Sequence, residues 1–281
     1  MLVCRKIREI REFVRAERKN GKTIGFVPTM GYLHHGHQML MREAKKECDV
    51  VVISIFVNPM QFGPNEDLDR YPRDFEKDHA LAEEVGVDAV FYPPVEEMYP
   101  SGYTTYVDLN SLTDCLCGKS RPGHFRGVAT VVTKLFNIVL PDKAFFGQKD
   151  AQQVLIIRRM AEDLNMPLEV VTVPIVREAD GLAMSSRNVY LTPEQRSKAV
   201  ILHKSLEAAA KAVEEGERDA QKIVCLVREM ISSIPGALID YVELRKYSDL
   251  SPADSMDGPS LLALAVRFGQ TRLIDNTVLE V

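Results

Sequence analysis

The fold is decided by TIGFVPTMGYLHHGH, residues 23–37, together with VVVISIFV, residues 50–57. The first stretch begins as a short apolar strand and runs through a proline into a glycine-containing turn. A helical pattern follows over residues 36–48, and the strongly apolar second stretch is typical of a strand buried on both faces. Strand, helix and buried strand in this order predict part of a parallel sheet covered by helices.

The same alternation continues along the chain. It predicts helices over residues 6–18, 72–85, 126–139 and 152–164, and strands over 89–92, up to Phe145-Phe146 and over 168–175. From residue 176 the pattern changes to two long helices, 193–214 and 220–231, followed by strands near 240–244, 261–268 and 271–274. Gly269-Gln270 separates the last two strands, as in a hairpin. We therefore expect an α/β fold with a Rossmann-like parallel-sheet domain over 1–175 and a smaller α+β domain over 176–281.

Composition excludes several classes of protein. The chain has 281 residues, of which 46% are hydrophobic and 27% charged, so it can bury a core. Its net charge of −5 disfavours a nucleic-acid partner, and its longest apolar run, residues 50–57, is too short to span a membrane. The five cysteines are scattered, which argues against a disulfide framework. We expect a cytoplasmic protein with no nucleic-acid or membrane partner.

An anion site is predicted at the turn between the first strand and its helix. Gly31 and Gly36 permit a tight turn, and the helix N-terminus offers N–H groups and a partial positive charge to a phosphate. His34 and His37 flank that N-terminus and can donate to phosphate oxygens. A metal site or a pair of surface histidines is the alternative, although no carboxylate or cysteine is grouped beside them in the sequence.

Two further strand ends carry polar residues suited to a small acid and a nucleotide. Asn58 and Gln61 follow the second strand, where ligands bind in open α/β sheets, although Asn-Pro is also an ordinary turn signal. Lys149 follows another strand end, with Gly147 and Asp150 beside it, and can stabilise charge on a phosphate. A solvated surface lysine is the alternative for Lys149.

A third polar segment, MSSRN, places Ser185, Ser186 and Arg187 in succession after the Asp180-Gly181 turn. Two hydroxyls and a guanidinium can bind phosphate oxygens, and the segment is predicted to be a loop able to close over a nucleotide. A polar linker between two domains is the alternative interpretation.

These segments together resemble a known family. HHGH, residues 34–37, is similar to the HxGH signature of the superfamily of nucleotidylyltransferases and class I aminoacyl-tRNA synthetases, which bind ATP at this turn. SIFVNPMQF (54–62), FFGQKDAQQ (145–153) and VREADGLAMSSRN (176–188) resemble the pantothenate synthetase family, also called pantoate–β-alanine ligases, in the family's order. The similarity runs from about residue 23 to 191. Gln148 and Ala151 stand where the family commonly has glutamate and an aromatic residue, and neither position carries assigned chemistry.

The resemblance implies ligation of pantoate and β-alanine to pantothenate, with ATP converted to AMP and diphosphate through pantoyl adenylate. It implies His37, His34 and Lys149 as catalytic residues, Gln61 and Gln153 as pantoate-binding residues, and Asn58 as a supporting member of that pocket. The ATP contacts that it implies are Met30, Gly31, Tyr32, Leu33, His34, His35, Gly36, His37, Gly147, Gln148, Lys149, Asp150, Val176, Met184, Ser185, Ser186 and Arg187. Mg²⁺ accompanies ATP, and a homodimer is expected.

Other residues carry weaker signals, and other functions fit the motifs less well. Arg121 and His124 are interpreted as helpers near the phosphates, and Asp67, Asp69, Asp74 and Asp78 are not assigned as metal ligands. A related nucleotidylyltransferase acting on a phosphate monoester shares the HxGH turn but does not explain the other segments. A non-catalytic nucleotide sensor would bind ATP without releasing pyrophosphate. A dinucleotide-dependent oxidoreductase lacks its GxGxxG after the first strand, and a tRNA synthetase lacks an anticodon-binding region.

Overall fold

A computed structural model describes residues 1–64 and 66–281. The described chain forms two compact units. The first contains Met1–Asn110, Arg121–Gln148 and Gln153–Pro174, and the second contains Ser111–Ser120, Lys149–Gln152 and Ile175–Val281. Residues 111–120 and 149–152 thus belong to the second unit, although they lie within the sequence range of the first. The predicted division into 1–175 and 176–281 does not set these two segments apart.

The first unit is built on a six-stranded sheet whose neighbouring strands pair in parallel. Its strands are β1 (Leu2–Cys4), β2 (Ile24–Thr29), β3 (Val50–Ile55), β4 (Ala89–Phe91), β5 (Lys143–Gly147) and β6 (Glu169–Val173), in the order β1-β4-β3-β2-β5-β6. All six residues of β3 are buried, as the apolar run predicted. The predicted parallel sheet is confirmed.

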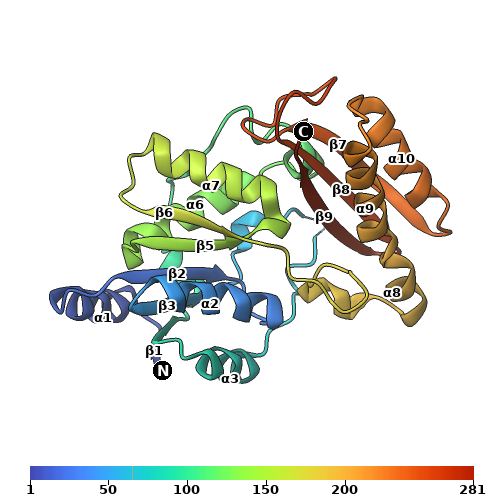
Figure 1. Cartoon of the computed structure of the whole chain (residues 1–281). Coiled ribbons are helices and arrows are strands. Elements are labelled where there is room, and N and C mark those ends of the chain that lie inside the picture. Colours follow the sequence, from blue (N-terminus) through green and yellow to red (C-terminus); the bar gives the residue numbers. More distant parts are fainter. Residues whose placement is uncertain (65) are drawn as a thin grey trace. The chain divides into compact units, whose positions relative to one another are not determined.

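Helices lie on both sides of this sheet (Figure 1). They are α1 (Ile7–Lys19), α2 (His35–Glu47), α3 (Phe75–Val85), α4 (Val95–Met98), α6 (His124–Val139) and α7 (Ala151–Asp163). One buried cluster joins Met41 and Ala44 of α2 and Ala82 of α3 to sheet residues that include Ile53. On α6, Phe136 packs edge-on against Phe146 of β5 at 6.3 Å between ring centroids.

The strand order places the polar segments at one edge of the sheet. Strand β2 has β3 on one side and β5 on the other. The chain adds β3 and then β4 on one side of β2, and it later adds β5 and then β6 on the other side, so the strand order reverses between β2 and β5. In open parallel sheets, ligands bind outside the carboxyl ends of the strands where the order reverses. The segments that follow β2, β3 and β5 all start at this edge.

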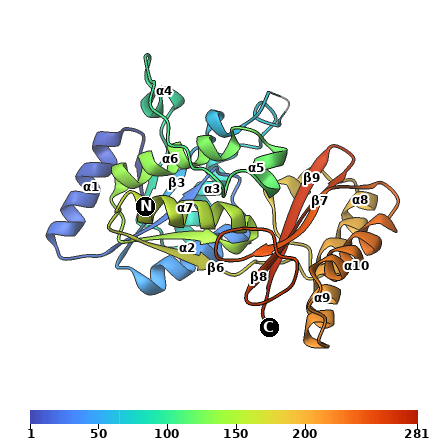
Figure 2. The same cartoon turned by 90° about the horizontal axis from the view of Figure 1, so that it is seen from above.

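The second unit has an antiparallel sheet in the order β7-β8-β9, formed by β7 (Ala237–Lys246), β8 (Ser260–Phe268) and β9 (Thr271–Leu279). Its helices are α5 (Leu116–Ser120), α8 (Pro193–Ala199), α9 (Ile201–Glu214) and α10 (Ala220–Ser232). Figure 2 shows α9 and α10 on the same side of this sheet. A buried cluster that includes Leu206, Val227 and Leu264 joins these helices to the sheet.

Three local predictions need correction. The helix predicted over 193–214 is divided into α8 and α9 around Val200. The strand predicted to end at residue 274 continues to Leu279, and Phe268 pairs with Thr271 across the predicted hairpin turn. Strand β1 and the short helices α4 and α5 were not predicted, since three to five residues carry too little periodicity to be recognised.

In the described chain, no helix is long and apolar enough to cross a membrane.

Candidate functional site

A buried carboxylate holds the turn that follows β2. Gly31 has a φ of +81°, and a Cβ placed there would lie 2.9 Å from Asp78 Oδ2. Asp78, on α3, is 1% exposed and accepts hydrogen bonds from the N–H groups of Tyr32 at 2.8 Å and Leu33 at 2.5 Å. Burial raises the pKa of the Asp78 carboxyl, although these N–H groups act in the opposite direction. The glycine and the aspartate together determine the path of the chain into α2.

His34 and His37 cap helix α2. His34 is the N-cap, and its Nδ1 accepts a hydrogen bond from the N–H of Gly36 at 3.1 Å. Nδ1 of His37 accepts in turn from the N–H of His34 at 3.2 Å, and the two ring centroids are 4.0 Å apart. A ring nitrogen that accepts carries no proton, so each neutral ring has its proton on Nε2. Both imidazoles can therefore donate from Nε2 to an anion while keeping the cap.

This capping changes the prediction for the helix N-terminus. The N–H of Gly36 is bonded to the His34 ring, and the N–H of His37 donates to the His34 carbonyl at 2.8 Å. Two of the backbone donors expected to bind a phosphate are therefore already paired within the helix. The two imidazoles, rather than these two N–H groups, are therefore the candidate donors at this turn.

Asn58 and Gln61 lie on a short 3-10 turn, η1 (Pro59–Gln61), directly after β3. Asn58 caps this turn by accepting from the N–H of Met60 at 3.3 Å, so the Asn-Pro turn signal is real. Its amide nitrogen also donates to Gln61 Oε1 at 3.1 Å. Asn58 is 1% exposed and Gln61 is 9% exposed, which leaves both amides in a nearly dry environment. The Asn58 side chain therefore both caps the turn and binds Gln61.

A group of ionisable side chains holds the Gln61 backbone. Arg121 binds Glu66 through two hydrogen bonds of 2.6 Å, and its third nitrogen lies 2.9 Å from Nε2 of His124. Nδ1 of His124 lies 2.8 Å from the Gln61 carbonyl oxygen. Burial raises the pKa of Glu66, but its hydrogen bonds to Arg121 and the charge of Arg121 outweigh burial and bring the pKa to about 2. The two residues interpreted as helpers thus contact the turn that carries Gln61.

The end of β5 contributes the remaining residues of the first unit. A Cβ placed on Gly147 would meet no atom of the described chain within 4 Å, so packing there does not require glycine. Gln148 follows it, and Gln153 lies in the first turn of α7; both are half-buried. Through β2, β3 and β5, the first unit therefore brings the histidine pair, Asn58, Gln61 and Gly147 to one edge of its sheet.

Lys149 and Asp150 belong to the second unit, between Gln148 and α7. The side chain of Asn276, on β9, donates to the Lys149 carbonyl at 2.9 Å. Gln152 accepts from the N–H of Cys117 on α5 at 2.9 Å. Asn276 was not predicted because its strand carries no motif. Gln152 was not predicted either, although its place inside FFGQKDAQQ was an available signal.

The segment 176–190 forms an ordered hairpin followed by a 3-10 turn. The N–H of Met184 donates to the Val176 carbonyl at 3.0 Å, and the N–H of Glu178 donates to the Leu182 carbonyl at 2.8 Å. Gly181, with a φ of +95°, completes the turn between them. Segment 176–190 therefore has defined backbone pairing within the second unit, which the interpretation as a polar linker did not predict.

Ser185, Ser186 and Arg187 lie where this hairpin meets the 3-10 turn η3 (Ser186–Tyr190). Ser185 is the N-cap of η3, and its hydroxyl accepts from the N–H of Arg187 at 3.2 Å. Ser186 is 9% exposed. Asn188 reaches back to the hairpin by donating to Glu178 Oε1 at 2.8 Å.

Two arginines hold the hairpin in place. Arg177 binds Asp275 of β9 through hydrogen bonds of 2.7 and 3.0 Å, and Asp275 is 2% exposed. Arg196, on α8, lies 2.7 Å from Glu178 and 2.7 Å from Asp180. Its hydrogen bonds lower the pKa of the Asp180 carboxyl. Neither arginine was singled out from the sequence.

Candidate metal ligands do not cluster in the part of the chain that the structure describes. Residues 1–64 and 66–281 contain no group of three His, Cys, Asp or Glu side chains able to hold a metal ion. Asp74 caps α3 by accepting from the N–H of Lys77, and both oxygens of Asp78 accept from backbone N–H groups. Among these residues, the metal alternative for His34 and His37 therefore lacks a third His, Cys, Asp or Glu ligand.

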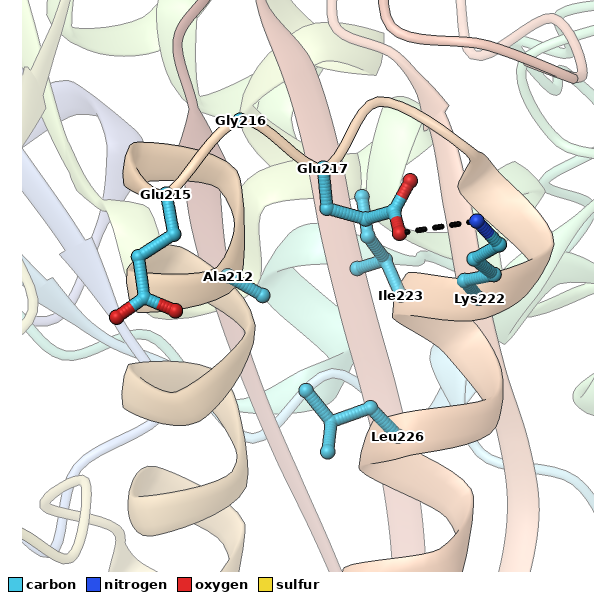
Figure 3. A pocket seen from close by; sticks show the side chains of 7 residues that line it. All are labelled: Ala212, Glu215, Gly216, Glu217, Lys222, Ile223 and Leu226. Atoms are coloured by element: carbon cyan, nitrogen blue, oxygen red, sulfur yellow. Dashed lines mark ion pairs between the residues drawn. The ribbon is translucent and has the colours of Figure 1, made fainter.

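A surface hollow of about 480 Å³ lies between the end of α9 and the start of α10 (Figure 3). Its lining includes Glu215, Glu217 and Lys222, and a 3.3 Å ion pair joins Lys222 to Glu217. It contains none of the predicted site residues.

Comparison with known proteins identifies the family. The pantoate–beta-alanine ligase family matches residues 2–278. A pantothenate synthetase from Pelotomaculum thermopropionicum is 69% identical over 279 residues, covering 99% of each chain. The crystal structure of pantothenate synthetase from Thermus thermophilus has a TM-score of 0.94 and 47% identity, and 99% of each chain is covered.

A third relative carries ligands. The structure of a pantoate–beta-alanine ligase from Francisella tularensis, complexed with beta-gamma ATP and beta-alanine, has a TM-score of 0.80 and 32% identity, covering 99% of this chain and 97% of that one. The fold predicted from the sequence is that of these enzymes. This chain belongs to the pantoate–β-alanine ligase family.

Proposed function

We propose that the residues at the carboxyl ends of β2, β3 and β5, with Lys149 and residues 184–187, bind and activate the substrates of this ligase. The enzyme joins pantoate to β-alanine with ATP as co-substrate, which is the reaction of its family. The roles given below to individual residues are proposals, supported by their positions and by their resemblance to the family's motifs.

The observation that carries the proposal is the pair of capped histidines. His34 and His37 have rings 4.0 Å apart, and each accepts a backbone N–H at Nδ1. The Nε2 atom of each neutral ring therefore carries the proton, at the sheet edge where ligands bind. A metal site would need unprotonated Nε2 atoms and further ligands, whereas a phosphate needs donors. The arrangement favours a phosphate chain.

In the first proposed step, a carboxylate oxygen of pantoate attacks the α-phosphorus of ATP. A new P–O bond forms, the bond to the bridging oxygen breaks, and pyrophosphate leaves with its electron pair. Gln61 and Gln153 hold pantoate, with Asn58 supporting Gln61. Neutral amides suit this task because they bind an anionic acid without removing the nucleophilic charge of its other oxygen.

Charge that develops on the phosphates is stabilised by several kinds of donor. Lys149 and Arg187 supply positive charge, while Ser185 and Ser186 supply hydroxyls. His34 and His37 donate from Nε2. Met30 to Gly36, Gly147, Gln148, Asp150, Val176 and Met184 line the ATP site, and the room beside Gly147 supports a close approach there.

In the second proposed step, the amine of β-alanine attacks the acyl carbon of pantoyl adenylate. An amide C–N bond forms, the C–O bond to AMP breaks, and the amine loses a proton to water. No covalent bond to the protein is needed, so catalysis consists of positioning and charge stabilisation.

Mg²⁺ is proposed as a companion of ATP. Since the described residues contain no group of three candidate ligands, the ion fits as one held by nucleotide phosphates and water. It would neutralise phosphate charge, and no step is derived through it.

A homodimer and a cytoplasmic location are also proposed, because both are implied by resemblance to the family. Light scattering behind a sizing column tests the first, and a mass close to one chain of 31.6 kDa would contradict it.

The deciding experiment measures pyrophosphate release from Mg·ATP with pantoate alone, with β-alanine alone and with both. Sustained turnover only with both, giving equal AMP and pantothenate, is expected. A burst with pantoate alone supports the adenylate step. Release with a phosphate monoester in place of pantoate would favour a nucleotidylyltransferase, and tight ATP binding without release would favour a nucleotide sensor.

A further inference from the structure

We propose that Tyr99 is a positioning residue that keeps the amide nitrogen of Gln61 turned toward pantoate, acting through Asn58. Tyr99 lies directly after α4, outside the four motifs quoted for the family resemblance. The inference rests on the proposed role of Gln61 in binding pantoate.

Two backbone groups favour one orientation of the Asn58 amide. The N–H of Met60 can only donate, and it points to Asn58 Oδ1 at 3.3 Å. The carbonyl of Gly127 can only accept, and it lies 3.1 Å from Asn58 Nδ2. A flipped amide would place nitrogen against N–H and oxygen against C=O, and at 1% exposure neither mismatch can be relieved by water.

The Asn58 amide then orients Gln61. Nδ2 of Asn58 donates its second hydrogen to Gln61 Oε1 at 3.1 Å. The amide nitrogen of Gln61 is consequently directed away from Asn58, and it lies 3.1 Å from the thioether sulfur of Met30. A thioether is a weak acceptor, so an oxygen of pantoate can readily replace it. Gln61 therefore presents donors, which match the oxygens of an anionic hydroxy acid.

Tyr99 completes the shell around Asn58. Its hydroxyl donates to Asn58 Oδ1 at 2.8 Å, which is shorter than the bond from Met60. Burial raises the pKa of the Tyr99 phenol, so the hydroxyl stays protonated and can donate at any working pH. The ring packs edge-on against Tyr103 at 5.1 Å, and Lys134 lies 5.6 Å from its centroid. Tyr99 is therefore held in place independently of the Asn58 contact.

The main test compares Tyr99→Phe with Tyr103→Phe. Tyr103 is a matched control because its ring contacts Tyr99 and also lies near Lys134, at 4.5 Å. We expect Tyr99→Phe to raise the KM for pantoate about 3- to 10-fold, the size of one lost hydrogen bond, with the KM for ATP within about 2-fold of the parent. Tyr103→Phe is expected to change neither constant. A rise in both KM values for Tyr99→Phe would indicate a general structural role and would overturn the proposal.

A double-mutant cycle tests whether Tyr99 acts through Gln61. In a Gln61→Ala background, Tyr99→Phe should have no further effect on the KM for pantoate. The same fold-change in both backgrounds would show that Tyr99 acts by another route. If Gln61→Ala alone leaves the KM for pantoate unchanged, the proposed role of Gln61 fails, and this inference fails with it for a separate and recognisable reason.

Gln61→Glu tests the orientation itself. The substitution is nearly isosteric and replaces the outward nitrogen by oxygen. If the nitrogen faces pantoate, Gln61→Glu should raise the KM for pantoate more than Gln61→Ala does, because an acceptor then meets the acid's oxygens. A Gln61→Glu variant that binds pantoate as well as, or better than, Gln61→Ala would show that the amide faces the other way.

Discussion

The turn of residues 30–37 and the segment of residues 176–190, which comprises the hairpin and η3, both carry groups proposed to bind phosphate, yet different forces hold them. In the first, backbone N–H groups are paired with the His34 ring, the His37 ring and the buried Asp78 carboxylate. In the second, two arginines bind carboxylates of β9 and of the hairpin itself. One segment is shaped by short-range capping and the other by ion pairs between side chains.

The difference teaches where each segment is vulnerable. A turn held by capping is sensitive to any side chain that alters its φ angles or occupies the space beside Asp78, and it is insensitive to salt. For a hairpin held by ion pairs, the stability lost when a pair is broken depends on how deeply that pair is buried. Salt and water screen an exposed pair, so its loss costs little, whereas breaking a buried pair leaves an unpaired charge in the interior. Three of the substitutions below test this contrast, and a fourth, Lys149→Ala, separates chemistry from scaffold.

Arg177→Gln should have the largest effect. It leaves the Asp275 carboxylate, 2% exposed, without its bidentate partner. The free energy of unfolding should fall by about 3–5 kcal/mol, measured by chemical denaturation. Adding Asp275→Asn should recover part of this loss, because two amides can then pair without charge. A loss below about 1 kcal/mol would show that the buried pair does not anchor the hairpin.

Lys149→Ala tests the chemistry rather than the scaffold. Asn276 binds the Lys149 carbonyl, so the backbone should keep its place while the charge is lost. Turnover should fall about 10²- to 10³-fold, the scale for one transition-state donor, with the midpoint of thermal unfolding unchanged. Lys204→Ala, at an exposed position on α9, is the control. A Lys149 variant with near-parental turnover would exclude this role.

Gly31→Ala tests the capped turn. A Cβ at a φ of +81° is strained, and here it also lies 2.9 Å from Asp78 Oδ2. We expect a loss of about 1–3 kcal/mol in unfolding free energy and reduced turnover. Gly86→Ala is the matched control, since Gly86 has a φ of +83° and no atom within 4 Å of the added Cβ in the described chain. Equal losses in both variants would mean that the Asp78 contact does not matter.

Arg196→Gln should have the smallest effect. The Asp180 carboxylate that it pairs with is 45% exposed, so the expected loss is below about 1 kcal/mol and should shrink in high salt. Because Arg196 lowers the pKa of Asp180, the stability from this pair is present above the ordinary pKa of an aspartate and is lost as pH falls through the lowered value. Denaturation at neutral pH and in acid measures this, and parent and variant should converge in acid. A gap that widened in acid would contradict the sign.

The prediction of the fold succeeded where periodicity was strong. Residues 50–57 were predicted to be a buried strand because nearly every position is apolar, and β3 is buried throughout. Val200 was not recognised as a boundary because apolar spacing continues across it. The contiguous ranges 1–175 and 176–281 stay a prediction, since hydrogen bonds such as that from Asn276 to the Lys149 carbonyl, 127 positions away, leave no local trace in sequence.

Residue types and their spacing were enough to predict the parallel sheet and the family, and to propose which residues offer donors to ATP and pantoate. The sequence could not determine in which direction those donors point. The Nε2 protons of His34 and His37 depend on which backbone N–H groups approach their rings, and the Gln61 amide depends on Asn58, Gly127 and Tyr99. An imidazole and an amide each have two ends that sequence does not distinguish. Only the hydrogen bonds formed when distant segments fold together select one end, because a mismatched donor or acceptor is costly in a buried site.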